Sequence, residues 1–512
     1  MKYFRVNLPS AAARHVVMFF CLAAACVTAA AQNASALKFA DVAGWWQAEP
    51  TYAGESSRVG LHFVEENGKQ VVRLSLFAIG GYDVPVGTVT LSGNTLDMQP
   101  YPFVLSYDPI KGTLSGVLPE AAAPVYRIPV EFRRSEPLPK PVPPDWSFGK
   151  PRLRWQLDLK APVWAGLERD ADSGMLFVGT DAGVLHAIAS GGQVAWTFDT
   201  GKAIKARPAV IGRFVYVASD SGFLYQLDKL RGTQRWRARI DTGSPPRIPA
   251  SQEKSRWDRY GSSVVADDRQ LYVASRDNHL YALDITTGKE RWRVTAKDMM
   301  TATPALYEGL VIWAAFDGTV QAVSASDGKP RWTYDARLAV AGDLIVDGDR
   351  VFVGSRTYDL IALNAANGAE LWKHYYWFSW IESPPVVRDQ VVYTGSSDGI
   401  GVYAINVNDG SLRWRTTVPG WAWPRTAVSD DLVVAGTVGV GAFPGARSGS
   451  LVALDRQSGA IRWLFLEPPA SETVEKKLEW GFAASPLIAD GVVYAADLGG
   501  RVHAFDARVG DS

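Results

Sequence analysis

The sequence predicts an all-β protein whose larger part is an eight-bladed β-propeller with four-stranded blades. Three observations predict this fold. A segment of about 40 residues recurs from the middle of the chain to its end, and each complete copy ends in a Gly-x-x-x-Trp element. A strand before the first copy also matches the strand that the last copy lacks. Repeats of about this length with four short strands each are typical of propeller blades.

Each repeat combines a strand, a tight turn and a tryptophan. Two examples are HLYALDITTGKERW, which ends at Trp292, and SLVALDRQSGAIRW, which ends at Trp463. The alternating run predicts a strand with one buried face. We expect its final Asp or Asn to bond the backbone of the turn, and the glycine before the tryptophan to adopt a left-handed conformation. The tryptophan then packs its ring against the neighbouring sheet.

The two ends of the repeat region predict how the ring closes. An eighth repeat begins at Ser485 and reaches Gly510 without a tryptophan strand. The missing strand is expected around Trp155, directly before the first full blade. An N-terminal strand that completes the last blade removes two open sheet edges. The structural docking residues are therefore Trp155, Trp196, Trp236, Trp292, Trp332, Trp372, Trp414 and Trp463.

A separate small antiparallel β barrel or sandwich is predicted over residues 38–134, ahead of the propeller. We expect Trp45 and Trp46 to lie in its core. Residues 135–149 are rich in proline and predict a stiff linker, so that the propeller occupies residues 150–512. The strand-like runs of the small domain are Val59–Val64, Gln70–Ala78, Val86–Leu91, Gly112–Leu118 and Tyr126–Arg133.

Residues 1–31 have the features of a secretory signal peptide, with a basic start, an apolar run and small residues at its end. Both cysteines, Cys21 and Cys26, lie inside this segment. The simpler interpretation is that they are removed with it. The alternative is a lipid anchor at Cys26, which would tether the protein to a membrane. In either case no cysteine of the mature globular part can form a disulfide or a thiolate nucleophile. We expect a monomer that is periplasmic or secreted.

The charge balance argues against a nucleic-acid partner. The chain has 53 basic and 53 acidic residues, so its formal net charge is zero. A neutral chain lacks the basic footprint that nucleic-acid binding requires.

The repeat between Leu271 and Trp292 resembles the pyrroloquinoline-quinone-type propeller repeat. Two classes share this repeat. One is similar to the BamB family of the outer-membrane β-barrel assembly machinery, and this resemblance implies a non-enzymatic scaffold. The other comprises quinoprotein dehydrogenases, and it implies a quinone and Ca²⁺ on the propeller axis. Many quinoprotein alcohol dehydrogenases carry an adjacent-cysteine disulfide, which the mature part of this chain lacks.

The leading hypothesis is a non-catalytic envelope protein that binds a partner protein or a small ligand at its loop-rich face. No catalytic residue and no metal site is predicted under it. The alternative is a pyrroloquinoline-quinone- and Ca²⁺-dependent dehydrogenase that oxidises an alcohol or a sugar, with Glu382 as the carboxylate for the metal. A third hypothesis makes the propeller a platform for the N-terminal domain, with carbohydrate as the ligand.

Long insertions gather on one face of the predicted ring, and loops of this kind commonly carry function. These loops and the adjoining inner strands hold aromatic and charged residues outside the docking positions. Flat aromatics beside arginines can stack on and pair with an anionic aromatic compound, a sugar or a peptide. They can also be anchors that pack over the ring, and Asp181 and Asp220 are expected to form turns. The candidate ligand-binding residues at the propeller mouth are Trp164, Arg207, Arg259, Tyr260, Trp380, Glu382, Trp423, Arg425 and Trp480.

Overall fold

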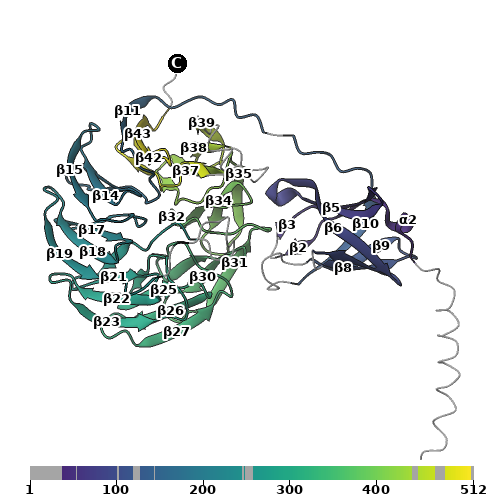
Figure 1. Ribbon diagram of the computed structural model, residues 1–512, viewed down its shortest axis with the longest axis horizontal. Helices are drawn as coiled ribbons and strands as arrows, with labels where there is room; N and C mark the ends of the chain where they lie inside the picture. Colours follow the sequence, from purple (N-terminus) through teal and green to yellow (C-terminus); the bar gives the residue numbers. More distant parts are fainter. Residues whose placement is uncertain are drawn as a thin grey trace, which may run out of the picture.

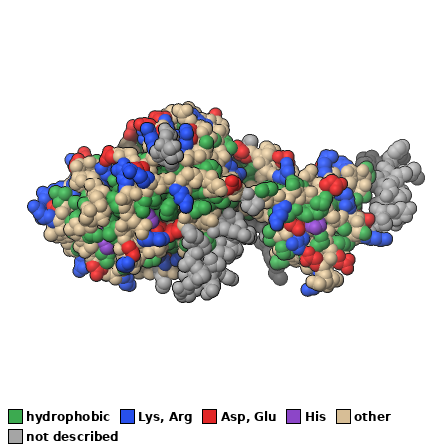
Figure 2. Space-filling model, turned by 90° about the horizontal axis from the view of Figure 1, so that it is seen from above, with side chains coloured by type: hydrophobic (Ala, Val, Ile, Leu, Met, Phe, Trp, Pro, Cys, Tyr) green, Lys and Arg blue, Asp and Glu red, His purple; other side chains and the backbone are tan. Residues whose placement is uncertain are grey.

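The computed structural model describes residues 37–52, 55–100, 103–118, 127–142, 144–244, 247, 258–440, 448–467 and 479–508. The expected signal peptide and Cys26 lie outside these residues. The described chain consists of a closed barrel and a ring of eight sheets (Figure 1). Charges of both signs are interspersed over the visible face of both parts (Figure 2).

The N-terminal domain is a closed barrel rather than a sandwich, because its first strand pairs with strands on both sides. A short helix, α2 (Phe39–Val42), precedes it, and a 3-10 turn, η1 (Phe77–Ile79), and a small hairpin, β2 (Thr51–Tyr52) with β3 (Glu55–Ser56), lie beside it. The barrel strands are β1 (Gly44–Ala48), β4 (Val59–Glu66), β5 (Lys69–Leu76), β6 (Gly81–Ser92), β7 (Thr95–Gln99), β8 (Phe103–Asp108), β9 (Thr113–Leu118) and β10 (Ile128–Ser135).

The two adjacent tryptophans of β1 face opposite sides of the barrel wall. Trp46 is fully buried in the core and donates its indole N–H to the Val42 carbonyl at 2.8 Å. Trp45 is only partly buried and stacks on His62 with ring centroids 4.1 Å apart. The expectation that both lie in the core is therefore correct for Trp46 and wrong for Trp45, because successive side chains of a strand point to opposite faces.

The propeller is formed by eight sheets, which we number as blades 1 to 8. Blade 1 contains β12 (Glu168–Arg169), β13 (Leu176–Gly179), β14 (Val184–Ile188) and β15 (Val194–Asp199). Blade 2 contains β16 (Ala209–Ile211), β17 (Phe214–Ser219), β18 (Phe223–Asp228) and β19 (Gln234–Arg239). Blade 3 contains β20 (Val264–Ala266), β21 (Gln270–Ala274), β22 (His279–Asp284) and β23 (Glu290–Thr295). Blade 4 contains β24 (Ala305–Tyr307), β25 (Leu310–Ala314), β26 (Thr319–Ser324) and β27 (Pro330–Asp335).

The second half of the ring repeats this arrangement. Blade 5 contains β28 (Ile345–Asp347), β29 (Arg350–Gly354), β30 (Asp359–Asn364) and β31 (Glu370–Tyr375). Blade 6 contains β32 (Val386–Arg388), β33 (Val391–Gly395), β34 (Gly401–Asn406) and β35 (Leu412–Thr417). Blade 7 contains β36 (Ala427–Val428), β37 (Leu432–Val440), β38 (Gly449–Asp455) and β39 (Ile461–Glu467), and β40 (Glu479–Gly481) extends β37. Blade 8 contains β41 (Leu487–Ala489), β42 (Val492–Ala496), β43 (Arg501–Asp506) and β11 (Leu153–Asp158).

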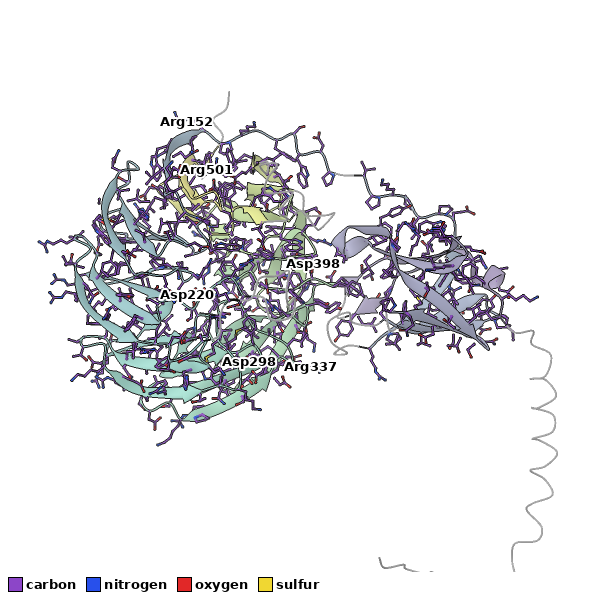
Figure 3. All side chains as sticks on the ribbon, viewed as in Figure 1. Arg152, Asp220, Asp298, Arg337, Asp398 and Arg501 are labelled. Carbon is purple, nitrogen blue, oxygen red and sulfur yellow. The ribbon has the colours of Figure 1, made fainter. Side chains whose placement is uncertain are left out.

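The last blade closes as the sequence predicts. β11 pairs with β43, so the strand around Trp155 completes the sheet that the C-terminal repeat begins. Arg152 and Arg154 both bond the Asp506 carboxylate, which ties the first strand of the ring to the last. Arg152 lies at the outer edge of the ring, where β11 begins (Figure 3).

The docking tryptophans join neighbouring blades through one repeated contact. The turn glycine of the next blade packs on the tryptophan ring; an added Cβ at Gly288 would lie 2.6 Å from the Trp236 ring. Gly288 also has φ +69°, so the predicted left-handed turn is confirmed. In seven of the eight blades the indole N–H donates to a backbone carbonyl of that turn, as from Trp463 to Ala507 at 2.8 Å. Trp236 is the exception.

Where the third strand ends in an aspartate, this residue organises the turn that follows. Asp284 accepts the backbone N–H of Thr286 at 3.1 Å and of Thr287 at 2.9 Å, as expected from the sequence. Its second oxygen accepts Arg291 at 2.5 Å. The bond from Arg291, together with those from Thr287, holds the pKa of Asp284 at about 2.

The barrel is held against the propeller from two sides. In the linker, Leu138 packs on the barrel wall and accepts the Tyr82 hydroxyl at 2.6 Å, while Gly149 accepts the Leu464 N–H of blade 7 at 3.0 Å. The hairpin β2–β3 meets blade 5, where Tyr52 packs edge-on against Tyr375 with centroids 5.0 Å apart. The barrel therefore lies beside β31 and β35 (Figure 1).

Candidate functional site

The structure brings most of the predicted mouth residues together around the propeller axis. Five of them line one cavity near the axis. A second cavity beside it is lined by Tyr260 and Glu382, which also line the first, and by Arg259. The cavities measure about 40 Å³ and about 10 Å³. Sites for small organic ligands usually span about 300–1,000 Å³. The five residues are Arg207, Tyr260, Glu382, Trp423 and Arg425.

Every charged residue among the candidates is engaged by an opposite charge of the protein itself. Arg207 bonds Glu168, and Arg425 Nη2 lies 3.0 Å from Asp343 Oδ2. Arg259 Nη2 lies 3.3 Å from Glu479 Oε1. Glu382 is bound by Arg356. Buried charges need such partners, because an isolated charge in a protein interior is strongly destabilising.

Glu382 and Arg356 form the most deeply buried of these pairs. Their side chains are 4% and 3% exposed, and Arg356 Nη2 lies 2.5 Å from Glu382 Oε1. The Arg356 guanidinium also lies over the Trp380 ring, 4.6 Å from its centroid. Trp380 thus contacts the mouth through Arg356. It also packs against an apolar cluster that combines residues of the barrel with residues of blade 5 and the loop after it.

Further ion pairs at the mouth were not predicted from the sequence. Lys205 Nζ lies 2.6 Å from Asp181 Oδ1, and Arg247 Nε lies 2.7 Å from Asp220 Oδ2. In addition to the turn role that the sequence predicts for these two aspartates, each neutralises a cation from a neighbouring loop. Burial raises the pKa of Asp220, but the bonds and charge of Arg247 outweigh it and hold that pKa below its usual value. Asp220 lies on the inner side of the ring (Figure 3).

Asp258 is another carboxylate at the mouth that was not predicted from the sequence, and it bonds two cations. It accepts Arg247 at 3.1 Å and Arg276 at 2.5 Å, and it is almost completely buried. Arg247 and Asp258 belong to the segment between blades 2 and 3, and Arg276 follows β21 of blade 3, but no motif in the sequence signals these pairs. Together with the pairs of Asp181 and Asp220, these contacts balance positive and negative charges at the mouth.

The aromatic candidates are packing residues of the mouth. Trp164 is 6% exposed and lies between Lys205 Nζ, 5.1 Å from its ring, and Arg259 Cζ, 5.3 Å from its ring. The Tyr260 hydroxyl donates to the Ala483 carbonyl at 3.0 Å, and burial raises the pKa of Tyr260. Trp423 is 3% exposed and packs on Trp421 at 5.0 Å.

Trp480 lies apart from the other candidates. It belongs to β40, which pairs with the long strand β37 outside the four-stranded blade. Its ring packs directly on Gly439, where an added Cβ would lie 2.3 Å from the indole. The structure therefore places it on the extension of blade 7 rather than at the axial cavity.

The mouth does not fit a quinone with Ca²⁺. Glu382, the carboxylate that the dehydrogenase hypothesis assigns to the metal, is bound by Arg356, and the axial cavity is far smaller than a cofactor of this size requires. Within the described ranges, no group of three or more His, Cys, Asp and Glu side chains is arranged to hold a metal ion. In the same part of the chain, no helix combines the length and apolar character needed to cross a membrane.

The fold and the mouth define a closed eight-bladed propeller whose axis is filled by its own ion pairs. The family model described as "Outer membrane protein assembly factor BamB" matches residues 151–256, 247–342 and 336–512. The chain belongs to this family. The barrel and the linker precede the matched residues.

Individual relatives carry the same name. The chain is 24% identical over 293 residues to the outer membrane protein assembly factor BamB of Yersinia pestis, covering 56% of this chain and 70% of that protein. It is 28% identical over 189 residues to the BamB of Burkholderia pseudomallei, covering 35% of this chain but only 45% of that protein.

Two solved structures share the fold. The computationally designed protein Ika8 superposes with a TM-score of 0.56 at 15% identity, covering 69% of this chain and 99% of the design. Saccharomyces cerevisiae Sqt1 superposes with a TM-score of 0.54 at 12% identity, covering 70% of this chain and 100% of that protein. At these identities the likeness concerns the fold alone.

Proposed function

We propose that this chain is an exported, non-catalytic scaffold of the cell envelope that binds a partner protein at the mouth face of its propeller. The observation that carries the proposal is the filled mouth of a BamB-family propeller. A protein partner needs a surface of suitable shape and charge, whereas a small substrate needs an enclosed cavity.

The charge arrangement of the mouth supports protein recognition. Arg207 and Glu168 remain 31% and 21% exposed although they bond each other, and Asp181 and Asp220 are also partly exposed. A partner can therefore meet charges of both signs at fixed positions. Fixed and already paired charges favour a specific partner without attracting anions or cations in general.

Export and a periplasmic position are part of the same proposal. The basic and apolar leader of residues 1–31 supports export. The name of the family, an outer membrane protein assembly factor, supports a position on the periplasmic side of that membrane. A lipid anchor at Cys26 would give a second attachment to the envelope.

Site-specific photo-crosslinking in the native host tests the proposal. A photo-reactive residue replaces Ala182, which is exposed in the mouth loop between β13 and β14, or Ala366, which is exposed in a turn of the opposite face. We expect crosslinks to an outer-membrane assembly protein from position 182 and none from position 366. Equal labelling from both positions would contradict binding at the mouth.

A second assay addresses the dehydrogenase alternative. The purified protein is incubated with pyrroloquinoline quinone, Ca²⁺ and a panel of alcohols and sugars, and reduction of an artificial electron acceptor is followed. We expect no substrate-dependent reduction above that of the quinone alone. Turnover that is lost in Glu382→Gln would overturn the non-catalytic proposal.

A further inference from the structure

Blade 2 departs from the repeat at its docking tryptophan. In the other seven blades this indole N–H donates to a carbonyl of the next blade's turn, as from Trp292 to Ala325 at 3.1 Å. In blade 2 the Ile285 carbonyl of that turn instead accepts the Gln226 amide at 3.1 Å. Trp236 Nε1 is buried and has no hydrogen-bond partner among the described residues.

The arginine next to this tryptophan departs from the repeat as well. In blades 3 and 7 the arginine before the docking tryptophan bonds the aspartate that ends the third strand, as Arg291 does with Asp284 at 2.5 Å. In blade 2 that aspartate, Asp228, is held by Arg213 from another turn, with Nη2 and Oδ2 3.3 Å apart. Arg235 consequently makes no ion pair with any described residue.

Arg235 and Trp236, the residues that carry these two donors, both line the same groove. It measures about 550 Å³ and lies between blades 2 and 3, on the face opposite the mouth. The aromatic side chains of Phe214, Tyr216 and Trp236 line it together with Arg213 and Arg235, and no carboxylate is among its lining residues. Its volume falls within the range of about 300–1,000 Å³ that small-molecule sites occupy.

We propose that this groove binds a small organic carboxylate with an apolar or aromatic body. The carboxylate accepts hydrogen bonds from the Arg235 guanidinium, which has no ion pair with the described residues, and from Trp236 Nε1, the docking indole that lacks a partner there. Its body packs on Phe214 and Tyr216. A charged acceptor suits this pair of donors, because guanidinium–carboxylate hydrogen bonds are stronger than those between neutral groups.

The full-length protein with ¹⁵N-labelled tryptophan allows a direct test by NMR of the indole N–H groups. The Trp236 signal is the one lost in Trp236→Phe. The probe is 4-phenylbutyrate, and 4-phenylbutyramide is its uncharged counterpart. We expect a saturable shift of the Trp236 signal with the acid, and at least tenfold weaker binding of the amide. No saturable shift with the acid, or equal binding of acid and amide, would overturn the proposal.

Two arginine variants separate binding from folding, with calorimetry as the readout. We expect Arg235→Gln to weaken binding of 4-phenylbutyrate at least tenfold. The matched control Arg291→Gln removes the equivalent arginine of blade 3, which is already paired, and should leave the affinity within twofold. Equal weakening in both variants would show that the groove does not recognise the carboxylate.

A third variant is designed to give blade 2 the aspartate–arginine pair that blade 3 has. Arg213→Gln releases Asp228, which can then bond Arg235 as Asp284 bonds Arg291. We expect binding of 4-phenylbutyrate to weaken at least fivefold while the other indole signals keep their positions. Unchanged affinity in this variant would contradict recognition through a free Arg235, even if Trp236→Phe does not fold.

Discussion

At the scale of single residues, the propeller mouth is a set of buried charges that depend on one another. Glu382 and Arg356 have almost no solvent contact, so each offsets part of the cost of removing the other's charge from water. Such pairs contribute little to net stability compared with apolar residues of similar size, but they fix the geometry of the side chains around them.

We predict that Glu382→Gln lowers the free energy of unfolding by about 3–5 kcal/mol, because it leaves the Arg356 guanidinium buried without a counter-charge. Urea unfolding followed by circular dichroism measures this change. The double substitution Glu382→Leu with Arg356→Met should recover most of the loss. As a control, Glu131→Gln breaks an exposed pair with Arg133 and should change stability by about 0.5 kcal/mol or less.

His374 adds a dependence on pH. Burial lowers its pKa from the ordinary 6.5 to about 4, although the bond between Nδ1 and the Gly410 carbonyl, 3.0 Å apart, opposes this. The unfolded chain takes up the proton first as pH falls below about 6.5, so the native state loses stability between pH 6.5 and 4.

We predict that this residue accounts for about 2–3 kcal/mol of the stability lost between pH 7 and pH 4.5. His374→Asn keeps a donor near the Gly410 carbonyl but cannot titrate. The difference in unfolding free energy between the two pH values should therefore shrink by this amount in the variant. Identical pH dependence of wild type and variant would show that the proton is not excluded from the folded state.

Sequence reasoning located the mouth residues but not their partners. Arg207, Arg259, Glu382 and Arg425 follow from their position beside the inner strands, which the repeat defines. Asp258 could not be assigned, because its contacts with Arg247 and Arg276 depend on the conformation of the loop before blade 3, which the repeat pattern does not define. The binding function of the mouth residues located from the sequence stays a prediction.

At the scale of elements, the turn between the third and fourth strands determines how blades stack. The same glycine must adopt a positive φ and leave room for the tryptophan of the preceding blade. Local sequence predicts the positive φ well, because it depends on the few residues of the turn, whereas the tryptophan that packs on the glycine comes from the preceding repeat.

We predict that Gly288→Ala lowers the free energy of unfolding by about 2–4 kcal/mol, because strain at φ +69° adds to overlap with the Trp236 ring. Gly309→Ala is the matched control: its φ is +76°, but nothing lies within 4 Å of an added Cβ. It should lose only about 1 kcal/mol. Thermal unfolding of both variants distinguishes the two contributions, and equal losses would mean that the tryptophan contact contributes nothing.

The barrel shows where local prediction is weaker. Five strand-like runs were predicted, whereas the wall also uses β1, β7 and β8. β7 and β8 are short and lie on either side of Pro100, so their alternation is brief. The choice between barrel and sandwich depends on β1 pairing with both β4 and β10, a long-range contact that no local pattern reveals.

At the scale of the whole molecule, this chain adds a barrel to a propeller of the BamB family. The barrel meets blade 5 through an apolar cluster that includes Tyr358, Tyr375 and Trp377. Arg415 of blade 6 adds a polar contact, since it donates to the Ala78 carbonyl at 3.1 Å. Part of the rim is therefore covered by the protein's own N-terminal domain.

We predict that Tyr52→Ser with Arg415→Gln releases the barrel from this rim without unfolding either part. Small-angle X-ray scattering should then show a larger radius of gyration, while circular dichroism stays unchanged. Ile110→Ser, at a position that is 95% exposed on the barrel, should leave the scattering curve as it is. An unchanged radius of gyration in the double variant would mean that the linker alone holds the barrel in place.

The pairing of β11 with β43 also sets a time order for folding. The two strands lie at opposite ends of the propeller sequence. Arg152 and Asp506, which join them, are 354 residues apart. A nascent chain cannot form this last sheet until its C-terminal repeat has been synthesised. For an exported protein, as we propose here, the ring would thus stay open until β43 has crossed the membrane, and the circle would close only on the far side.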